Sequence, residues 1–230
     1  MRFSDMNWMD VENYLKHDNR VMIVLGACEQ HGYLSLLTDS RIPEAMADAA
    51  SEKTGVIVAP TINLGVSPYF LDYPGSISLR LTTMINLLED TVRSLYHSGF
   101  RNMLFVNGHG GNTPASTRLV ELMNELTGLN SAWYSWWQSD SVTAVAKQHG
   151  LQSFHAAWIE AFPFVRVCDL PNEVKTPPQV KGIFGAKETR AIYGDGVFGG
   201  PYTVEGTILD EVFQAAVSDI CVLLEFNKRD

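Results

Sequence analysis

The sequence has 230 residues, of which 46% are hydrophobic and 19% charged, with a formal net charge of −9 at pH 7. This composition excludes a disordered chain and favours one folded domain over residues 1–230. The negative charge opposes binding to nucleic acid and to anionic membranes, and no apolar run approaches the roughly 20 residues that span a bilayer. Because the N-terminus also lacks a basic segment followed by an apolar core, we expect a cytoplasmic protein.

The predicted elements alternate between strand and helix along the chain. The apolar run 21–25 ends in Gly26-Ala27 and predicts a central strand that is buried on both faces. The elements that follow are a helix over 42–51, a strand over 55–59, a helix over 81–97, a strand over 102–106, a helix over 117–126, a strand over 132–137 and a helix over 209–226. This alternation predicts an α/β fold of three layers, α/β/α, with a mostly parallel central sheet.

Two segments, 64–78 and 168–202, are rich in Gly, Pro, Asp and Asn and show no clear periodicity. We interpret both as long loops. Loops of this length inside a compact domain are commonly functional, and ligands of parallel sheets bind beyond the carboxyl ends of the strands.

The three cysteines, Cys28, Cys168 and Cys221, lie far apart in the chain. They show none of the paired spacings of zinc ribbons or redox motifs, so neither a disulfide framework nor a thiolate metal site is expected. We interpret them as buried free thiols.

Histidines and carboxylates follow the carboxyl ends of two predicted central strands. Glu29 and His31 come shortly after the strand over 21–25, and in extended backbone residues i and i+2 project to one face. His109 follows the strand over 102–106 within NGHGGN at 107–112, whose glycines permit a close approach or a positive φ. Asp39 follows His31 after a short loop. Carboxylate oxygens and imidazole nitrogens are ligands of Zn²⁺ and Mn²⁺, and two such ions commonly share a carboxylate.

Alternative interpretations of these residues remain open. Asp39 could cap the helix that is predicted to begin near Ser40, and an isolated histidine is more often a core or surface residue than a ligand. A phosphate-binding role for NGHGGN is the weaker alternative, because the motif has no lysine and matches neither nucleotide fingerprint. Trp136, Trp137 and Trp158 could wall a planar substrate, although aromatic residues at such places more often pack in the core.

Four ordered motifs carry a family resemblance: EQHG at 29–32, TD at 38–39, NGHGGN at 107–112 and HAAWIEAF at 155–162. YPGSIS at 73–78 and GVFGGP at 196–201 also match the same pattern. Together they resemble the creatininase family, the creatinine amidohydrolases and their relatives, over nearly the whole length of the chain. The resemblance implies a creatininase-like fold, a hydrolase acting on C–N bonds other than peptide bonds, a small-molecule substrate and a homo-oligomer such as a hexamer.

The resemblance also implies roles for individual residues. Five residues would bind a pair of divalent metal ions, Zn²⁺ or Mn²⁺, with Asp39 bridging them: Glu29, His31, Asp39, His109 and Glu160. His155 is the implied proton donor, and the implied substrate-binding residues are Tyr73, Gly110, Gly111, Trp136 and Trp158. The implied reaction is the hydrolysis of a small amide, a cyclic amide first, by a metal-bridging hydroxide. The alternatives are a related metal hydrolase acting on a cyclic sugar ketone or a formamide, and a non-catalytic member of the fold.

This sequence departs from the family pattern in three motifs. Creatininase has a glutamate ligand two residues after the histidine of the NGHGGN loop, whereas this chain has Gly111, as does a glycine-containing branch of the family. The segment GYLSLLTD at 32–39 is shorter than usual and lacks a Pro-His pair. Ala157, Ala161 and Phe162 replace the usual Gly, Thr and Ser, which makes that wall more apolar. Gly111 and the altered HAAWIEAF motif favour the non-catalytic alternative.

The spacing of His155 and Glu160 restricts the local structure. Five residues on a regular helix turn by about 140°, so both side chains can face one site only if His155 precedes the helix. Ser153 as a helix cap predicts instead that the helix begins before His155.

Overall fold

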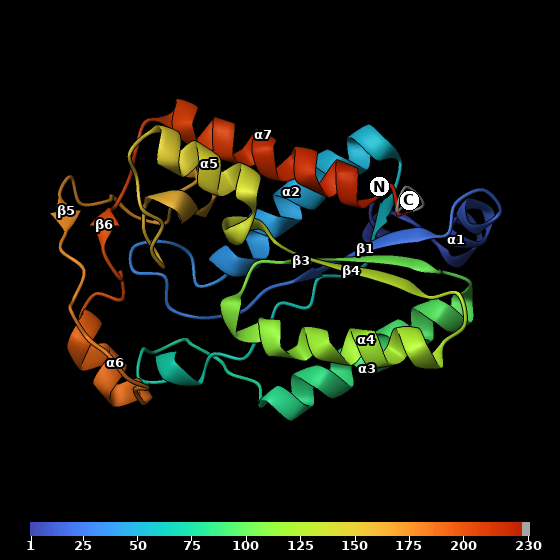
Figure 1. Ribbon diagram of the computed structural model, residues 1–230, viewed down its shortest axis with the longest axis horizontal. Helices are drawn as coiled ribbons and strands as arrows, with labels where there is room; N and C mark the ends of the chain where they lie inside the picture. Colours follow the sequence, from blue (N-terminus) through green and yellow to red (C-terminus); the bar gives the residue numbers. More distant parts are fainter. Residues whose placement is uncertain (227–230) are drawn as a thin grey trace.

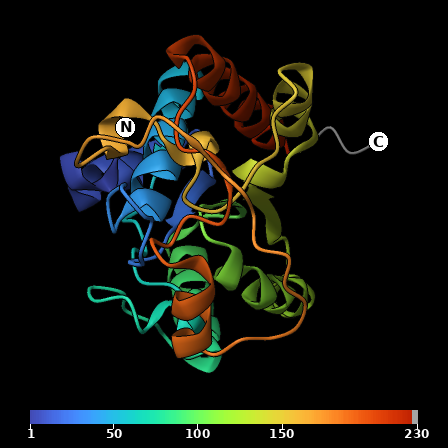
Figure 2. The same cartoon turned by 90° about the vertical axis from the view of Figure 1, so that its left-hand side faces the viewer.

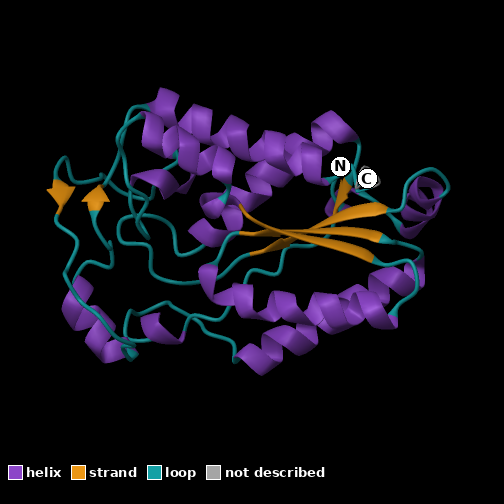
Figure 3. Ribbon diagram, in the orientation of Figure 1, coloured by secondary structure: helices purple, strands orange, loops and turns teal. Residues whose placement is uncertain are grey.

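A computed structural model describes residues 1–226 and shows three layers, with helices on both faces of a central sheet (Figures 1 and 3). The strands are β1 (Arg20–Leu25), β2 (Ile57–Val58), β3 (Asn102–Asn107) and β4 (Asn130–Ser135). They are all parallel and lie in the order β2-β1-β3-β4. Arg20 pairs with Asn102 and Leu25 with Asn107, so β1 and β3 end at the same level. The predicted parallel α/β/α architecture is confirmed.

The two faces of the sheet pack against two separate groups of helices. Met22 and Val24 of β1 belong to the core under α2 (Thr38–Thr54), α5 (Asp140–Gln148) and α7 (Gly206–Leu223). Val21, Ile23 and Leu25 belong to the core under α3 (Leu81–Ser98) and α4 (Thr117–Glu125). Because both faces are covered, β1 has no polar alternation, which explains its continuous apolar run.

Several observed elements differ from the predicted ones. β4 ends at Ser135 and not at Trp137, α7 ends at Leu223 and not at Phe226, and α1 (Trp8–Leu15) and α5 were not predicted. The segment 168–202 is not a continuous loop, because it contains β5 (Val174–Lys175), α6 (Ala186–Tyr193) and β6 (Gly200–Pro201), with β5 and β6 antiparallel. Figure 1 shows α6, β5 and β6 set apart from the sheet at one side of the molecule, and Figure 2 views the molecule from that side, with α6 in orange.

Two further sequence expectations concern cysteines and membranes. Cys28, Cys168 and Cys221 are free thiols as expected, but Cys168 is exposed and the other two are partly exposed, so the expectation that they are buried is wrong. Within residues 1–226, the structure contains no helix with the length and apolarity that a bilayer crossing requires.

The start of α2 positions part of the candidate site. α2 begins at Thr38, before the predicted start at Ile42, and its N-cap Leu37 makes no side-chain capping hydrogen bond. Pro43 lies inside the helix and has no N–H, so the carbonyl oxygen of Asp39 lacks its usual intrahelical donor. Local backbone hydrogen bonds support the first turn instead, from the N–H groups of Thr38 and Ser40 to the carbonyl oxygens of Ser35 and Leu37.

Candidate metal centre

Five buried titratable side chains meet at the carboxyl ends of β1 and β3. Glu29 and His31 lie in the loop after β1, and His109 follows β3 directly. Asp39 lies in the first turn of α2, and Glu160 ends the 3-10 helix Trp158–Glu160. Their exposed fractions are 1% for Glu29 and His31, 3% for Asp39, 4% for His109 and 8% for Glu160. Burying so many ionisable groups is costly unless they pair with one another or coordinate a cation.

Asp39 stands between two groups of ligand atoms. Its Oδ2 atom lies 2.9 Å from Nδ1 of His109, and Oε1 of Glu29 lies 3.4 Å from the same nitrogen. Its Oδ1 atom lies 3.0 Å from Nε2 of His31, and Oε1 of Glu160 lies 3.6 Å from that nitrogen. Within each triad the potential ligand atoms are all within 4.8 Å of one another. One carboxylate thus belongs to both triads, one oxygen to each, as a bridging ligand would.

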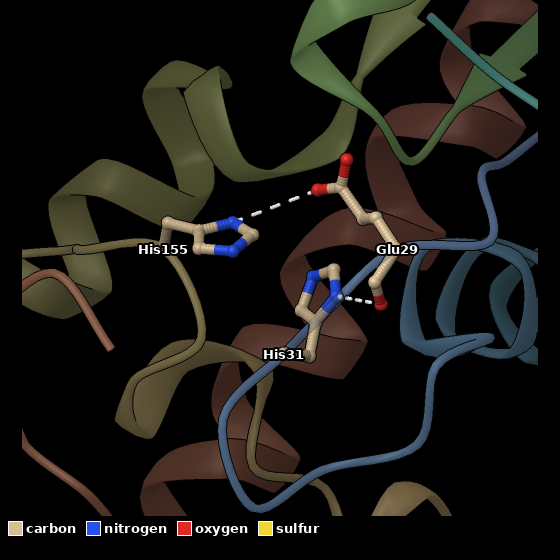
Figure 4. Close-up of side chains that lie close together, drawn as sticks. All are labelled: Glu29, His31 and His155. Carbon is tan, nitrogen blue, oxygen red and sulfur yellow. Dashed lines mark hydrogen bonds and ion pairs between the residues drawn. The ribbon is translucent and has the colours of Figure 1, made fainter. Parts of the chain in front are cut away.

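Backbone carbonyl groups orient both imidazoles. Nδ1 of His31 lies 3.3 Å from the carbonyl oxygen of Glu29 (Figure 4). Nε2 of His109 lies 2.9 Å from the carbonyl oxygen of Val66 and 3.2 Å from Oγ of Ser67. Since a carbonyl only accepts, each imidazole donates there, and its other nitrogen presents a lone pair toward Asp39. Metal-binding histidines are commonly oriented in this way.

These atoms fit divalent cations. Among the described residues, Oε2 of Glu29, Nε2 of His31 and Oδ2 of Asp39 are buried without a hydrogen-bond partner. An imidazole lone pair and a carboxylate oxygen repel each other at about 3 Å. A proton or a metal ion between the imidazole nitrogen and the Asp39 oxygen removes this repulsion. Imidazole nitrogen and carboxylate oxygen together are the donor set of Zn²⁺ and Mn²⁺.

The pKa shifts show how strongly this place attracts positive charge. Burial by itself lowers the pKa of His31 and His109, but the neighbouring carboxylates raise both well above their usual value. Burial by itself raises the pKa of Asp39, yet the two imidazoles hold it below its usual range. Without metal ions, protons would therefore occupy the positions between imidazoles and carboxylates.

Two glycines at the strand ends allow α2 to reach the site. A Cβ atom on Gly108 would lie 2.0 Å from the carbonyl oxygen of Asp39, and one on Gly26 would lie 2.2 Å from Oγ of Ser40. The absence of side chains at both positions lets the start of α2 carry Asp39 between the ends of β1 and β3. Because Asp39 lies inside the helix and Leu37 is the N-cap, the alternative that Asp39 is a helix cap is wrong.

The NGHGGN loop is held by its two asparagines. Asn112 donates from Nδ2 to the carbonyl oxygen of Gly26 at 3.0 Å, and its Oδ1 accepts from the backbone N–H of Val66 at 3.2 Å. Asn107 donates to the carbonyl oxygen of His109 at 2.8 Å and accepts from its N–H at 3.2 Å. Among the described residues, the glycines of this loop are not among those with positive φ. Glycine provides space here rather than a left-handed backbone.

Gly111 leaves no room for a side chain. A Cβ atom there would lie 2.0 Å from the carbonyl oxygen of Val66, 2.6 Å from Nε2 of His109 and 2.7 Å from Oη of Tyr69. A glutamate at this position would require the backbone near Val66 to move. The triad around His109 thus has Glu29 and Asp39 as its other protein donors, which leaves coordination positions open as in catalytic metal sites.

His155 lies outside any α-helix and forms a third group of potential ligand atoms with Glu29 and His31, again within 4.8 Å of one another. It precedes the 3-10 helix Trp158–Glu160, so the expectation of a helix beginning near Ser153 is wrong and both His155 and Glu160 reach the centre. Between them Ala156 has a φ of 59°, and its N–H donates to Oε2 of Glu160 at 2.6 Å. This tight turn holds Glu160 close to the histidine.

The surroundings of His155 keep its imidazole neutral. Nδ1 lies 3.9 Å from Oε1 of Glu29 (Figure 4), while Nε2 lies 2.8 Å from Nε2 of Gln30 and 3.2 Å from the Gln30 carbonyl oxygen. The ring stacks on Phe70 with centroids 4.7 Å apart. Burial lowers the pKa of His155 well below its usual value, and the neighbouring His31 lowers it further.

A cavity of about 860 Å³ opens on this centre. Of the expected substrate-binding residues, Gly110 and Gly111 line it, while Tyr73, Trp136 and Trp158 are not among its described lining residues. Trp136 and Trp158 are 1% and 0% exposed and belong to the hydrophobic core, the alternative that the sequence left open.

Several lining residues were not predicted. They are aromatic side chains of the loops around the site, and include Tyr69, Phe70 and Phe198. Trp137, which the sequence offered as a possible wall of a planar substrate, also lines the cavity. Trp137 follows β4 closely, as His109 follows β3, and this position at the end of a parallel strand predicts that a side chain lies near the site. No local signal distinguishes the other three residues, because they come from the two segments expected to be loops.

The structure is therefore that of a parallel α/β protein with a buried carboxylate and imidazole site suited to divalent cations. A family model described as creatininase, creatinine amidohydrolase, matches residues 4–224. The chain belongs to the creatininase family.

Three curated relatives show different named activities. The chain is 35% identical over 120 residues to the mycofactocin precursor peptide peptidase of Mycolicibacterium smegmatis. It is 29% identical over 110 residues to the 3-dehydro-scyllo-inosose hydrolase of Thermotoga maritima and 28% identical over 116 residues to the creatinine amidohydrolase of Pseudomonas putida. The alignments cover 49%, 47% and 47% of this chain and 48%, 35% and 45% of those relatives, so the match spans about half of their length or less.

Solved structures share the fold over the whole chain. A crystal structure of creatinine amidohydrolase has a TM-score of 0.85 and 21% sequence identity, covering 100% of this chain and 98% of that one. A structure described as creatininase Mn has a TM-score of 0.81 and 21% identity, covering 100% and 99%. At this level of identity the likeness establishes the fold alone.

Proposed function

We propose that this protein is a hydrolase of an amide C–N bond that depends on two divalent metal ions, which share Asp39. The observation that carries the proposal is the division of the Asp39 oxygens between two buried triads, one with Glu29 and His109 and the other with His31 and Glu160. Zn²⁺ and Mn²⁺ are the proposed ions. Solved creatininases described as a Mn form and a Zn-Zn type support this choice.

Such ions, when bound, supply a nucleophile derived from water at neutral pH and polarise the substrate carbonyl group. The protein residues then have separate tasks. Glu29, His31, Asp39, His109 and Glu160 hold the ions. His155, whose low pKa keeps it neutral, would accept the proton that the attacking water loses and deliver it to the departing nitrogen.

We propose a cyclic amide as the first candidate substrate class, because the family model is described as creatinine amidohydrolase. A peptide-like amide is the second candidate, since the peptidase relative is 35% identical to the chain and the creatinine amidohydrolase 28%. A cyclic sugar ketone is favoured only by the inosose hydrolase relative. The homo-oligomeric state and the cytoplasmic location remain predictions from the sequence.

Metal analysis followed by substrate screening tests the proposal. Purified protein supplied with Mn²⁺ or Zn²⁺ should bind close to two ions per chain and hydrolyse members of an amide panel that contains creatinine, other lactams and short peptides, with formation of a carboxylate as the measured product. Binding of fewer than one ion per chain would contradict the metal centre. Two bound ions without amide hydrolysis, but with ring opening of a cyclic ketone, would favour the alternative hydrolase, and two ions without any turnover would favour a non-catalytic protein.

A further inference from the structure

We propose that the substrate carries an aromatic or bulky apolar group without negative charge next to the scissile amide. The outer part of the cavity, around Phe184, Tyr193 and Phe198, binds this group. This inference rests on the proposed amide hydrolysis and narrows its substrate class. It follows from three properties of the cavity: its aromatic wall, the nature of its charged groups and its size.

The aromatic wall is continuous with the catalytic histidine. The aromatic lining residues are Tyr69, Phe70, Trp137, Phe154, Phe184, Tyr193 and Phe198. Phe70 stacks on His155 at 4.7 Å and lies 5.9 Å from Phe198, whose ring stacks on Tyr193 at 3.8 Å. A group attached to an amide beside His155 would therefore contact aromatic carbon over the length of this wall, which favours apolar and aromatic groups.

Apart from His155, all titratable acidic and histidine residues of the lining belong to the metal centre. They are Glu29, Asp39, His109 and Glu160, and no lysine or arginine is among the described residues that line the cavity. The remaining polar side chains of the lining, Gln138, Thr143, Ser153 and Thr189, are neutral. A carboxylate or phosphate in the outer part would lose water without gaining a protein cation, and such desolvation is costly. The bound group is therefore not an anion.

The size of the cavity favours a substrate larger than a single compact ring. Its volume of about 860 Å³ lies within the roughly 300–1,000 Å³ of pockets that enclose drug-sized ligands. At its edge Ile183 is 102% exposed, and the adjacent Phe184 also lines the cavity. Ile183 and Phe184 thus extend the apolar lining to the exposed edge of the cavity.

Three hydroxamic acids with the same metal-binding head test this inference on the metal-loaded protein. They are acetohydroxamic acid, 3-phenylpropionohydroxamic acid and its 4-carboxyphenyl analogue, with dissociation constants measured by isothermal titration calorimetry. Burial of the phenylethyl group should make the second probe about 10- to 100-fold tighter than the first. The 4-carboxyphenyl analogue should bind at least about tenfold more weakly than the phenyl probe, because its carboxylate loses water without gaining a protein cation.

Variants in the segment 180–184 test whether the cavity lining causes the tighter binding of the phenyl probe. Phe184→Ala should reduce the advantage of the phenyl probe several-fold and leave acetohydroxamic acid unchanged. Val180→Ala is the matched control, because Val180 is an exposed apolar residue of the same segment outside the described lining. It should change neither dissociation constant.

Two results would overturn the inference: a phenyl probe that binds no tighter than acetohydroxamic acid, or a carboxylate analogue that binds as tightly as the phenyl probe. Failure of the proposed function has a different signature, namely absence of both divalent ions and of acetohydroxamic acid binding. In that case 3-phenylpropionamide is compared with acetamide by ligand-observed NMR, since binding of these amides requires no metal. Equal binding of the two amides would again overturn the aromatic preference.

Discussion

Asp39 and His109 lie far apart in the chain, yet Oδ2 of Asp39 is 2.9 Å from Nδ1 of His109 in the buried centre. The other oxygen of Asp39 makes the equivalent approach to His31 at 3.0 Å. A single carboxylate therefore joins two groups of ligands, and the loss of this carboxylate should affect both groups. The first prediction follows from this arrangement.

Asp39→Ala should lose both metal ions, whereas Glu29→Ala should weaken mainly the ion near His109. The reason is that the Asp39 oxygens approach both His31 and His109, at 3.0 and 2.9 Å, whereas the shortest imidazole approach of the Glu29 carboxylate is the 3.4 Å from Oε1 to Nδ1 of His109. Metal content per chain, measured by inductively coupled plasma mass spectrometry after dialysis, checks this. Asp90→Ala on the exposed surface of α3 is the control and should keep both ions. Equal metal content in Asp39→Ala and the unaltered protein would refute the bridging role.

The dependence of stability on pH should reverse when metal binds. In the metal-free protein, the carboxylates outweigh burial and raise the pKa of His31 and His109 well above the usual value. A group with a raised folded-state pKa stabilises the fold fully below its unfolded pKa of about 6.5 and loses this contribution as pH rises through the folded value. The free energy of unfolding of the metal-free protein should thus decrease as pH rises above about 6.5.

Metal-loaded protein should show the opposite slope over the same range, because the ions replace the protons and bind more tightly as pH rises. Urea unfolding monitored by circular dichroism, with and without a chelator, measures both slopes. Parallel pH profiles for the two forms would show that protons and metal ions do not compete for these imidazoles.

Alanine should be tolerated at Gly110 but not at Gly111. A Cβ atom on Gly110 would meet only Trp137, at 3.8 Å, whereas one on Gly111 would lie 2.0 Å from the Val66 carbonyl oxygen that orients His109. Gly110→Ala should change the free energy of unfolding by less than about 0.5 kcal/mol. Gly111→Ala should lower it by about 1–3 kcal/mol and weaken metal binding.

Thermal unfolding and metal titration of the two glycine variants check this pair. Gly110→Ala serves as the control for added bulk in the same loop. Similar melting temperatures and metal affinities for both variants would contradict the close approach of Val66 to Gly111.

His155→Ala should keep both metal ions and lower turnover most on amides with a poor leaving group. A general acid contributes in proportion to the need of the departing nitrogen for a proton, typically about 10²- to 10⁴-fold. The ratio of rates on an unactivated amide and an activated anilide, measured with metal content on one preparation, checks this role. An unchanged ratio with the metals retained would remove His155 from proton transfer, and loss of metal would make it a ligand.

Local sequence patterns determined the strands and the candidate ligands. The runs 21–25 and 102–106 are apolar because both faces of the sheet are covered, and such burial leaves a direct signal in the sequence. The ligand types are equally visible, since Glu29, His31 and His109 follow these runs within a few residues. The family motifs extended the set to Glu160, whose side chain the structure places 3.6 Å from His31.

Only the tertiary structure decided which residues share the site and which pack in the core. The order β2-β1-β3-β4 brings the ends of β1 and β3 together, and no local pattern specifies which strands are neighbours. The position of Asp39 depends on contacts of α2 with Gly26 and Gly108, and the helix starts before its predicted beginning. Trp136 and Trp137 are adjacent and alike in sequence, yet one is 1% exposed in the core and the other lines the cavity. Their difference arises from the path of the backbone after β4, because a turn at the strand end sends successive side chains to different surroundings, and that path is set by packing between distant segments.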